Sequence, residues 1–277
     1  MNRPLKPSSP TTDSPSGFTL IELLVATAVF AVLMALLLSI VSQTTRLWQQ
    51  SENQKVRRQN ARILLEIMTR DMESALFPLD RTNVQSMQFL LNPPEAPLHR
   101  DAAFWQAVVP GQSAKGDVYE VGYFVQWTND AKDRPRSALC RYSVPAANTD
   151  TIFYNPSAPW LTPQKLAAYA PGLGDTNTFK GVLAENVIGL WITLYGEDGS
   201  TNGLGAPYDS RTATARPASA EVAFVLLDAN AANRLQSVAS ITNNISSTPE
   251  ALVESLPDDM RGATQIFRAR ARFEAAP

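Results

Sequence analysis

An apolar run near the N-terminus constrains this chain more than any other feature. Residues 18–41 include a single charged side chain, that of Glu22. As a helix rising about 1.5 Å per residue, the run is roughly 36 Å long, enough to cross a hydrocarbon core of about 30 Å. A helix in a soluble core rarely stays apolar on every face for this length, and a secretory signal has an apolar region of only about 7–15 residues. The run therefore predicts a transmembrane helix over residues 18–41.

The helical pattern continues beyond this run. Neither Gly nor Pro occurs from residue 18 to residue 77, and Pro78 is a helix breaker. Apolar side chains then recur at spacings of one, three and four, which is typical of an amphipathic helix. They are Ala61, Leu64, Leu65, Met68, Met72, Ala75 and Leu76. We therefore predict one long helix whose second part, residues 42–77, buries one face against a domain.

The remaining segments differ sharply in composition. Residues 1–17 hold four prolines and many hydroxyl side chains, which predicts a flexible polar leader. Residues 78–277 contain β-branched and aromatic runs, which predict strands. The runs are 86–91, 104–109, 118–127, 138–144, 187–195, 220–228 and an alternating segment at 264–273. We expect loops at 145–180 and 199–218 and a short helix at 229–240. The predicted fold class is α+β, with a long N-terminal transmembrane helix packed on an antiparallel β-sheet domain.

The composition argues against several functions. Lys and Arg total 24 and Asp and Glu total 26, so the chain has no general electrostatic attraction to nucleic acid. The single cysteine, Cys140, excludes an internal disulfide, and the single histidine, His99, argues against a catalytic triad or a multi-histidine metal site. No glycine-rich segment matches a nucleotide-binding loop. We expect no catalytic residue, no metal and no cofactor, and therefore no enzyme.

Glu22 is the most informative single residue. An acidic side chain in the middle of a membrane costs about 2.5–3.5 kcal/mol, and less near an end of the helix, so it normally has a functional partner. If the chain were cut after Gly17, Phe18 would carry a new α-amino group about one turn from Glu22. Between staggered neighbouring helices, Glu22 of one chain would meet the Phe18 amine of another. The alternative is that the Glu22 side chain extends to the membrane–water interface and has no functional partner.

The segment Gly17, Phe18, Thr19, Leu20, Ile21, Glu22, Leu23, followed by the apolar run, resembles the N-terminus of type IV prepilins and type II secretion pseudopilins. The resemblance implies that a prepilin peptidase cuts between Gly17 and Phe18 and N-methylates Phe18. It also implies that Glu22 is the assembly carboxylate, and that the fold is pilin-like. Compared with many leaders of this family, residues 1–17 are longer, less basic and richer in proline.

Two weaker resemblances concern the rest of the chain. The mature length of 260 residues and the helical segment at 62–72 look like the J-type minor pseudopilin. The segments at 183–200, 207–211 and 220–235 resemble the Verru_Chthon cassette protein C family. Together these resemblances imply a minor pseudopilin-like subunit of a type II secretion or type IV pilus-like filament.

The resemblance also implies partners and a location. The partners are other pilin or pseudopilin subunits, a prepilin peptidase and an inner-membrane assembly platform. The basic residues that flank the apolar run are too evenly divided to set its orientation. In this family the peptidase acts at the cytoplasmic face. We therefore expect a single-pass inner-membrane protein with a cytoplasmic N-terminus and a periplasmic or extracellular domain at 78–277.

Two other functions stay open at this point. A membrane-anchored tip or adhesion module that binds DNA or glycan would expose the arginine row and four tryptophans of the domain. These residues are Arg268, Arg270, Arg272, Trp105, Trp127, Trp160 and Trp191. A membrane-tethered hydrolase would need several acids in one cleft. Acidic loops offer oxygen atoms to calcium, but their spacing matches no EF-hand loop. The oxygen-bearing residues are Asp175, Asn177, Glu197, Asp198 and Asn202.

Overall fold

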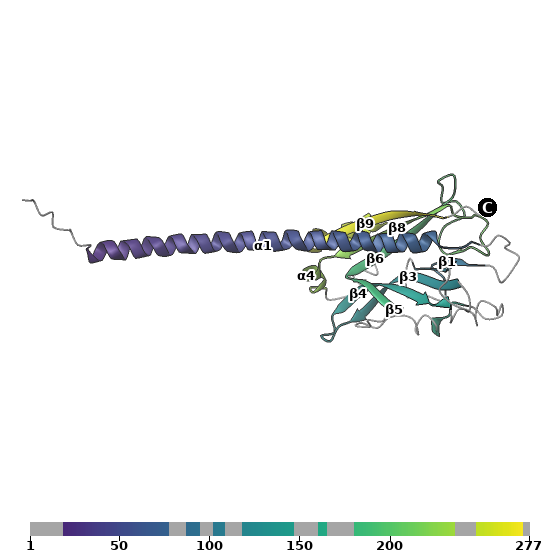
Figure 1. The fold of residues 1–277 in the computed structure, drawn as a ribbon, viewed down its shortest axis with the longest axis horizontal. Helices are drawn as coiled ribbons and strands as arrows, with labels where there is room; N and C mark the ends of the chain where they lie inside the picture. The colour runs from purple at the N-terminus through teal and green to yellow at the C-terminus, as the bar shows by residue number, and fades with distance from the viewer. Residues whose placement is uncertain are drawn as a thin grey trace, which may run out of the picture. The chain divides into compact units, whose positions relative to one another are not determined.

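The computed structural model describes residues 19–77, 87–94, 102–108, 118–146, 160–164, 180–235 and 248–273. It confirms the α+β fold class, because a long N-terminal helix is followed by antiparallel β-sheets (Figure 1). The chain forms two compact units, Met1–Arg58 and Gln59–Pro277.

Helix α1 spans Leu20–Glu73 and contains no glycine or proline. It ends four residues before the end that we predicted from Pro78. The reason is strand pairing: Ala75 forms an antiparallel bridge with Ala107, and the Leu76 N–H donates to the Gln106 carbonyl at 3.2 Å. The chain therefore leaves the helix to pair with residues 106 and 107 before the proline is reached.

The larger sheet has six antiparallel strands in the order β5-β4-β3-β2-β1-β7. Their bounds are β1 Phe89–Leu91, β2 Ala103–Val108, β3 Val118–Asn129, β4 Pro135–Val144, β5 Lys180–Glu185 and β7 Tyr208–Asp209. Four of these strands fall within or beside predicted runs. Strand β5 begins at the last residue of the predicted loop 145–180, and β7 lies within the predicted loop 199–218, where a strand was not expected. Each pairs with a longer strand, β4 or β1.

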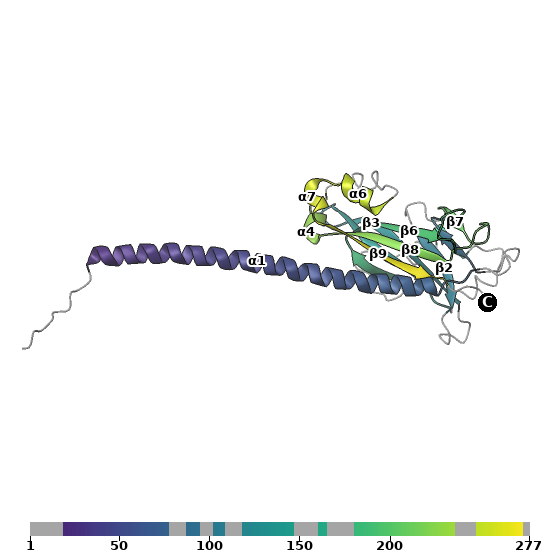
Figure 2. The ribbon, with the colours of Figure 1, turned by 90° about the horizontal axis from the view of Figure 1, so that it is seen from above.

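The smaller sheet has three antiparallel strands in the order β6-β8-β9. They span Val187–Tyr195, Ser219–Leu227 and Thr264–Arg272. Short helices α4 Ala229–Ala232, α6 Pro249–Ser255 and α7 Asp258–Arg261 gather beside this sheet (Figure 2). An apolar cluster that includes Trp191, Val225 and Leu252 joins the sheet to α4 and α6. Only α4 was predicted, and it is shorter than the predicted helix at 229–240, of which residues 236–240 lie outside the described residues.

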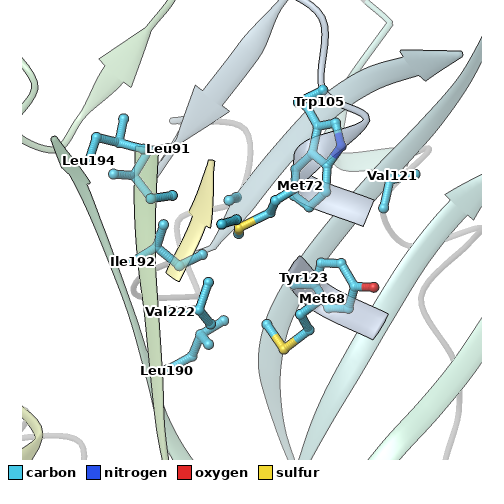
Figure 3. Packing of buried hydrophobic residues seen from close by; sticks show 14 of the residues in the cluster. Met68, Met72, Leu91, Trp105, Val121, Tyr123, Leu190, Ile192, Leu194 and Val222 are labelled. Carbon is cyan, nitrogen blue, oxygen red and sulfur yellow. The ribbon is translucent and has the colours of Figure 1, made fainter. Parts of the chain in front are cut away.

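The central core of the unit Gln59–Pro277 joins α1 to both sheets. Met68 and Met72 are fully buried, and their side chains lie between Trp105 and Tyr123 of the larger sheet and Ile192 of the smaller one (Figure 3). The predicted apolar stripe is buried from Ala61 to Ala75, and its last member, Leu76, is half-buried. Burial of each leucine or methionine in this stripe contributes about 1.5–3 kcal/mol, so the stripe fixes the helix to the sheets.

Strand β9 shows the predicted alternation. Ala271 and Phe273 are buried, Phe267 and Ala269 pack against the central core, and the three arginines between them are exposed. The strand therefore has one apolar face and one cationic face.

Candidate functional site

The first turn of α1 is closed by a reciprocal set of hydrogen bonds. The backbone N–H and the hydroxyl of Thr19 both donate to Oε2 of Glu22, each at 3.0 Å. The Glu22 N–H approaches Oγ1 of Thr19 at 3.4 Å. This is a capping box, in which a Thr at the N-cap and a Glu three residues later satisfy donors that the helix itself leaves unpaired. The carboxylate is also close to the positive end of the helix dipole.

The helix that follows is long and apolar enough to cross a membrane. The segment Leu20–Thr45 has a mean hydropathy of 2.8, and its side chains are exposed in the isolated chain. Four of its hydroxyl groups are paired within the helix: those of Thr27, Ser42, Thr44 and Thr45 donate to backbone carbonyls three or four residues earlier at 2.8–2.9 Å. A helix in lipid requires such internal pairing because no water is available.

Of the three residues predicted to carry the function, the structure describes one. Gly17 and Phe18 lie outside the described residues. Glu22 lies one turn into α1, exposed, with its Oε2 on Thr19. The predicted carboxylate is thus presented at the start of the apolar helix, while its pairing with a neighbouring chain stays a prediction.

A second polar site, which sequence reasoning missed, fastens α1 to the larger sheet. Asp71 lies on α1 and is 8% exposed. Its Oδ2 accepts hydrogen bonds from the Tyr123 hydroxyl at 2.6 Å and from Nε of Arg141 at 2.8 Å. Its backbone carbonyl accepts one from Nε1 of Trp105 at 3.1 Å. Residues from β2, β3 and β4 therefore converge on Asp71 of α1: Tyr123 and Arg141 bind its carboxylate, and Trp105 binds its backbone carbonyl.

Burial governs the chemistry of this polar site. It raises the pKa of Tyr123 well above its usual value, and the nearby negative charge of Asp71 raises it further. The phenol therefore stays protonated and acts as a donor. The sequence did hold a signal, because Asp71 lies three residues after Met68 and seven after Leu64, on the apolar stripe. A carboxylate on a buried face needs a donor partner.

The tryptophans proposed for a DNA- or glycan-binding tip are not exposed on the surface of the domain. Trp105, Trp160 and Trp191 are buried, and Trp127 is half-buried. Their burial removes the motivation for that hypothesis. In the arginine row, Arg268 forms an ion pair with Glu250, and Arg270 donates to the Ser219 hydroxyl and covers the Tyr195 ring.

The remaining candidates show no site. Among the described residues, no group of three or more His, Cys, Asp or Glu side chains is placed to hold a metal ion. Asp198 lies in an exposed turn and accepts from the Ser200 N–H at 2.9 Å, while Asp175, Asn177 and His99 lie outside the described residues. Cys140 is buried, and burial raises the pKa of its thiol to about 12.

Comparison with known families locates the recognisable segment. Residues 14–38 match the family described as the prokaryotic N-terminal methylation motif. The chain therefore carries a prepilin-type motif, which indicates a type IV pilin or pseudopilin substrate and implies processing by a prepilin peptidase and assembly with other pilin subunits. Searches of curated proteins and of solved structures found no significant match. In the part of the chain that the structure describes, one helix is long and apolar enough to span a membrane, which fits single-pass membrane anchoring as in prepilins.

Proposed function

We propose that this protein is a minor pseudopilin-like structural subunit of a type II secretion or type IV pilus-like filament. The observation that carries the proposal is the methylation motif at residues 14–38, which overlaps the first turns of a helix able to span a membrane. A prepilin peptidase cuts between Gly17 and Phe18 and methylates the new amine. The resemblance to J-type pseudopilins and to the Verru_Chthon cassette proteins supports a minor rather than a major subunit.

In this proposal, Glu22 pairs with the Phe18 amine of a neighbouring subunit. The capping hydrogen bonds hold its side chain at the start of the helix through Oε2. Among the described residues, Oε1 makes no hydrogen bond, so it is available to a donor from another chain. In surroundings of low dielectric, a charge pair of this kind favours the one helical stagger that joins the two groups.

The same proposal assigns a location to each segment of the chain. Residues 1–17 form the leader, residues 18–41 cross the inner membrane, and the helix continues from residue 42 to Glu73. The N-terminus is cytoplasmic, and residues 78–277 form the periplasmic, pilin-like domain. The inner-membrane assembly platform and other pilin subunits are its partners, and the protein has a structural rather than a catalytic role.

Processing is tested by replacing Gly17. Gly17→Ala places a side chain beside the bond that is cut, and we expect the leader to be retained. The measurement is the mobility and intact mass of the protein extracted from membranes. If the variant and the native protein differ in mass by the substitution alone, both chains retain residue 17. That result would contradict processing at this bond.

The role of Glu22 is tested with three variants that separate charge from capping. Glu22→Gln keeps an oxygen that accepts the capping hydrogen bonds but removes the charge, whereas Thr19→Ala removes the cap and keeps the charge. Glu22→Val removes both the charge and the acceptor. We expect both Glu22 variants to insert into membranes and to be lost from filaments, and Thr19→Ala to assemble better than either. Normal incorporation of Glu22→Gln would refute charge pairing.

A further inference from the structure

Trp48 stands apart from the other tryptophans of the chain. It lies on α1 three residues beyond the apolar segment Leu20–Thr45, and 74% of its side chain is exposed. Trp105, Trp160 and Trp191 are buried in the unit Gln59–Pro277. We propose that Trp48 is the interfacial anchor of the transmembrane helix, and that its indole binds in the headgroup layer of a phospholipid bilayer.

The spacing along α1 places the indole at the depth of this layer. The apolar stretch of residues 20–41 is about 33 Å long, which fills a hydrocarbon core of about 30 Å. The backbone of Trp48 lies about 10 Å beyond Val41 on the same helix. Because side chains on a helix lean toward its N-terminus, the indole reaches back toward the membrane by about one turn, or 5.4 Å. It therefore lies about 5 Å outside the hydrocarbon, within a headgroup layer of about 5–7 Å.

The chemistry of the ring fits this depth. Indole joins a large apolar face to one N–H donor, which is why Trp is enriched where membranes meet water. Between the hydrocarbon and the ring lie Ser42, Thr44 and Thr45. Their hydroxyls donate to backbone carbonyls of the same helix, so these side chains need no water as a hydrogen-bond partner at this depth.

The anchor also determines the depth of Glu22. Trp48 lies 26 residues after Glu22 on α1, which corresponds to about 39 Å. A bilayer with its headgroups is about 40–45 Å thick, so a ring in one headgroup layer places Glu22 close to the opposite one. The carboxylate is then spared the cost of the bilayer centre. This inference rests on the proposed transmembrane role of the helix.

The experiment measures tryptophan depth in the full-length protein. The protein is reconstituted into phosphatidylcholine vesicles whose acyl chains carry bromine, a quencher of indole fluorescence, either near the headgroup or near the chain end. The emission of Trp48 is obtained by subtracting the fluorescence of Trp48→Phe from that of the native protein. Two controls are built on Trp48→Phe: adding Phe30→Trp places a probe in the apolar segment, and adding Ile63→Trp places one at an exposed position about 22 Å farther along α1.

We expect Trp48 to be quenched more by shallow than by deep bromine, the residue 30 probe to show the opposite order, and the residue 63 probe to lose no emission. If the residue 30 probe is quenched and Trp48 is not, the interfacial anchor is refuted while the transmembrane helix stands. A blue-shifted but unquenched Trp48 would place the ring against another copy of the chain and would also refute it. If neither Trp48 nor the residue 30 probe is quenched, the transmembrane role itself is wrong.

Discussion

Replacing Asp71 by Asn tests how α1 is fastened to the sheet domain. The substitution keeps the size of the side chain and removes the charge that accepts from Tyr123 at 2.6 Å and from Arg141 at 2.8 Å. A hydrogen bond to a charged group contributes about 1.5–3 kcal/mol, and breaking a buried ion pair costs about 3–5 kcal/mol. Since the Arg141 side chain is 22% exposed, water offsets part of the loss. We expect about 3 kcal/mol of destabilisation, at the lower end of that range.

The assay is thermal unfolding of the full chain in detergent micelles, followed by near-ultraviolet circular dichroism. Trp105 and Tyr123 stack with ring centroids 5.7 Å apart beside Asp71, so their signal reports on this part of the core. In a unit of about 200 residues, 1 kcal/mol shifts Tm by about 2–4 °C, so Asp71→Asn is expected to lower Tm by about 6–12 °C.

Two further variants make this result specific. Glu66→Gln neutralises an exposed carboxylate on the same helix and is expected to change stability by less than about 0.5 kcal/mol. Tyr123→Phe removes one of the two donors, and its effect should not add to that of Asp71→Asn, because the two side chains share a hydrogen bond. Equal Tm values for Asp71→Asn and Glu66→Gln would refute the role assigned to Asp71.

Three further outcomes are expected. Because burial raises the pKa of Cys140 to about 12, a maleimide should label this thiol only after the protein is unfolded with denaturant; rapid labelling of the folded chain would contradict this. The unfolded thiol titrates near pH 8.5, so the folded state gains stability from Cys140 below that pH and loses it as the pH rises toward 12. A urea titration should therefore show a smaller alkaline loss for Cys140→Ala. A Cβ at position 122 would overlap the Phe104 ring, so Gly122→Ala should cost about 1–3 kcal/mol in the same assay.

Much of the fold follows from local sequence patterns. The long helix, the buried stripe on its second part and seven of the strands were readable because periodicity reports which face of an element is buried. Strand β7 has two residues and depends entirely on pairing with β1, so no local pattern marks it. The helix ends at Glu73 for a similar reason, since the bridge between Ala75 and Ala107 joins residues distant in the sequence.

One of the two candidate sites can also be predicted from local sequence, and the other depends on contacts between distant segments. Glu22 stands out because a charge in an apolar run is conspicuous on its own, and its capping partner Thr19 is a neighbour in the sequence. The site at Asp71 joins residues from one helix and three strands, so no single segment carries it. Sequence reasoning could find the buried carboxylate but not the identity of Tyr123 and Arg141 as its donors.

The intact mass of the protein extracted from membranes of its native host tests the central claim most directly. The account predicts a chain of 260 residues that begins at Phe18 and carries one added methyl group on its amine. A mass corresponding to all 277 residues without modification would contradict it.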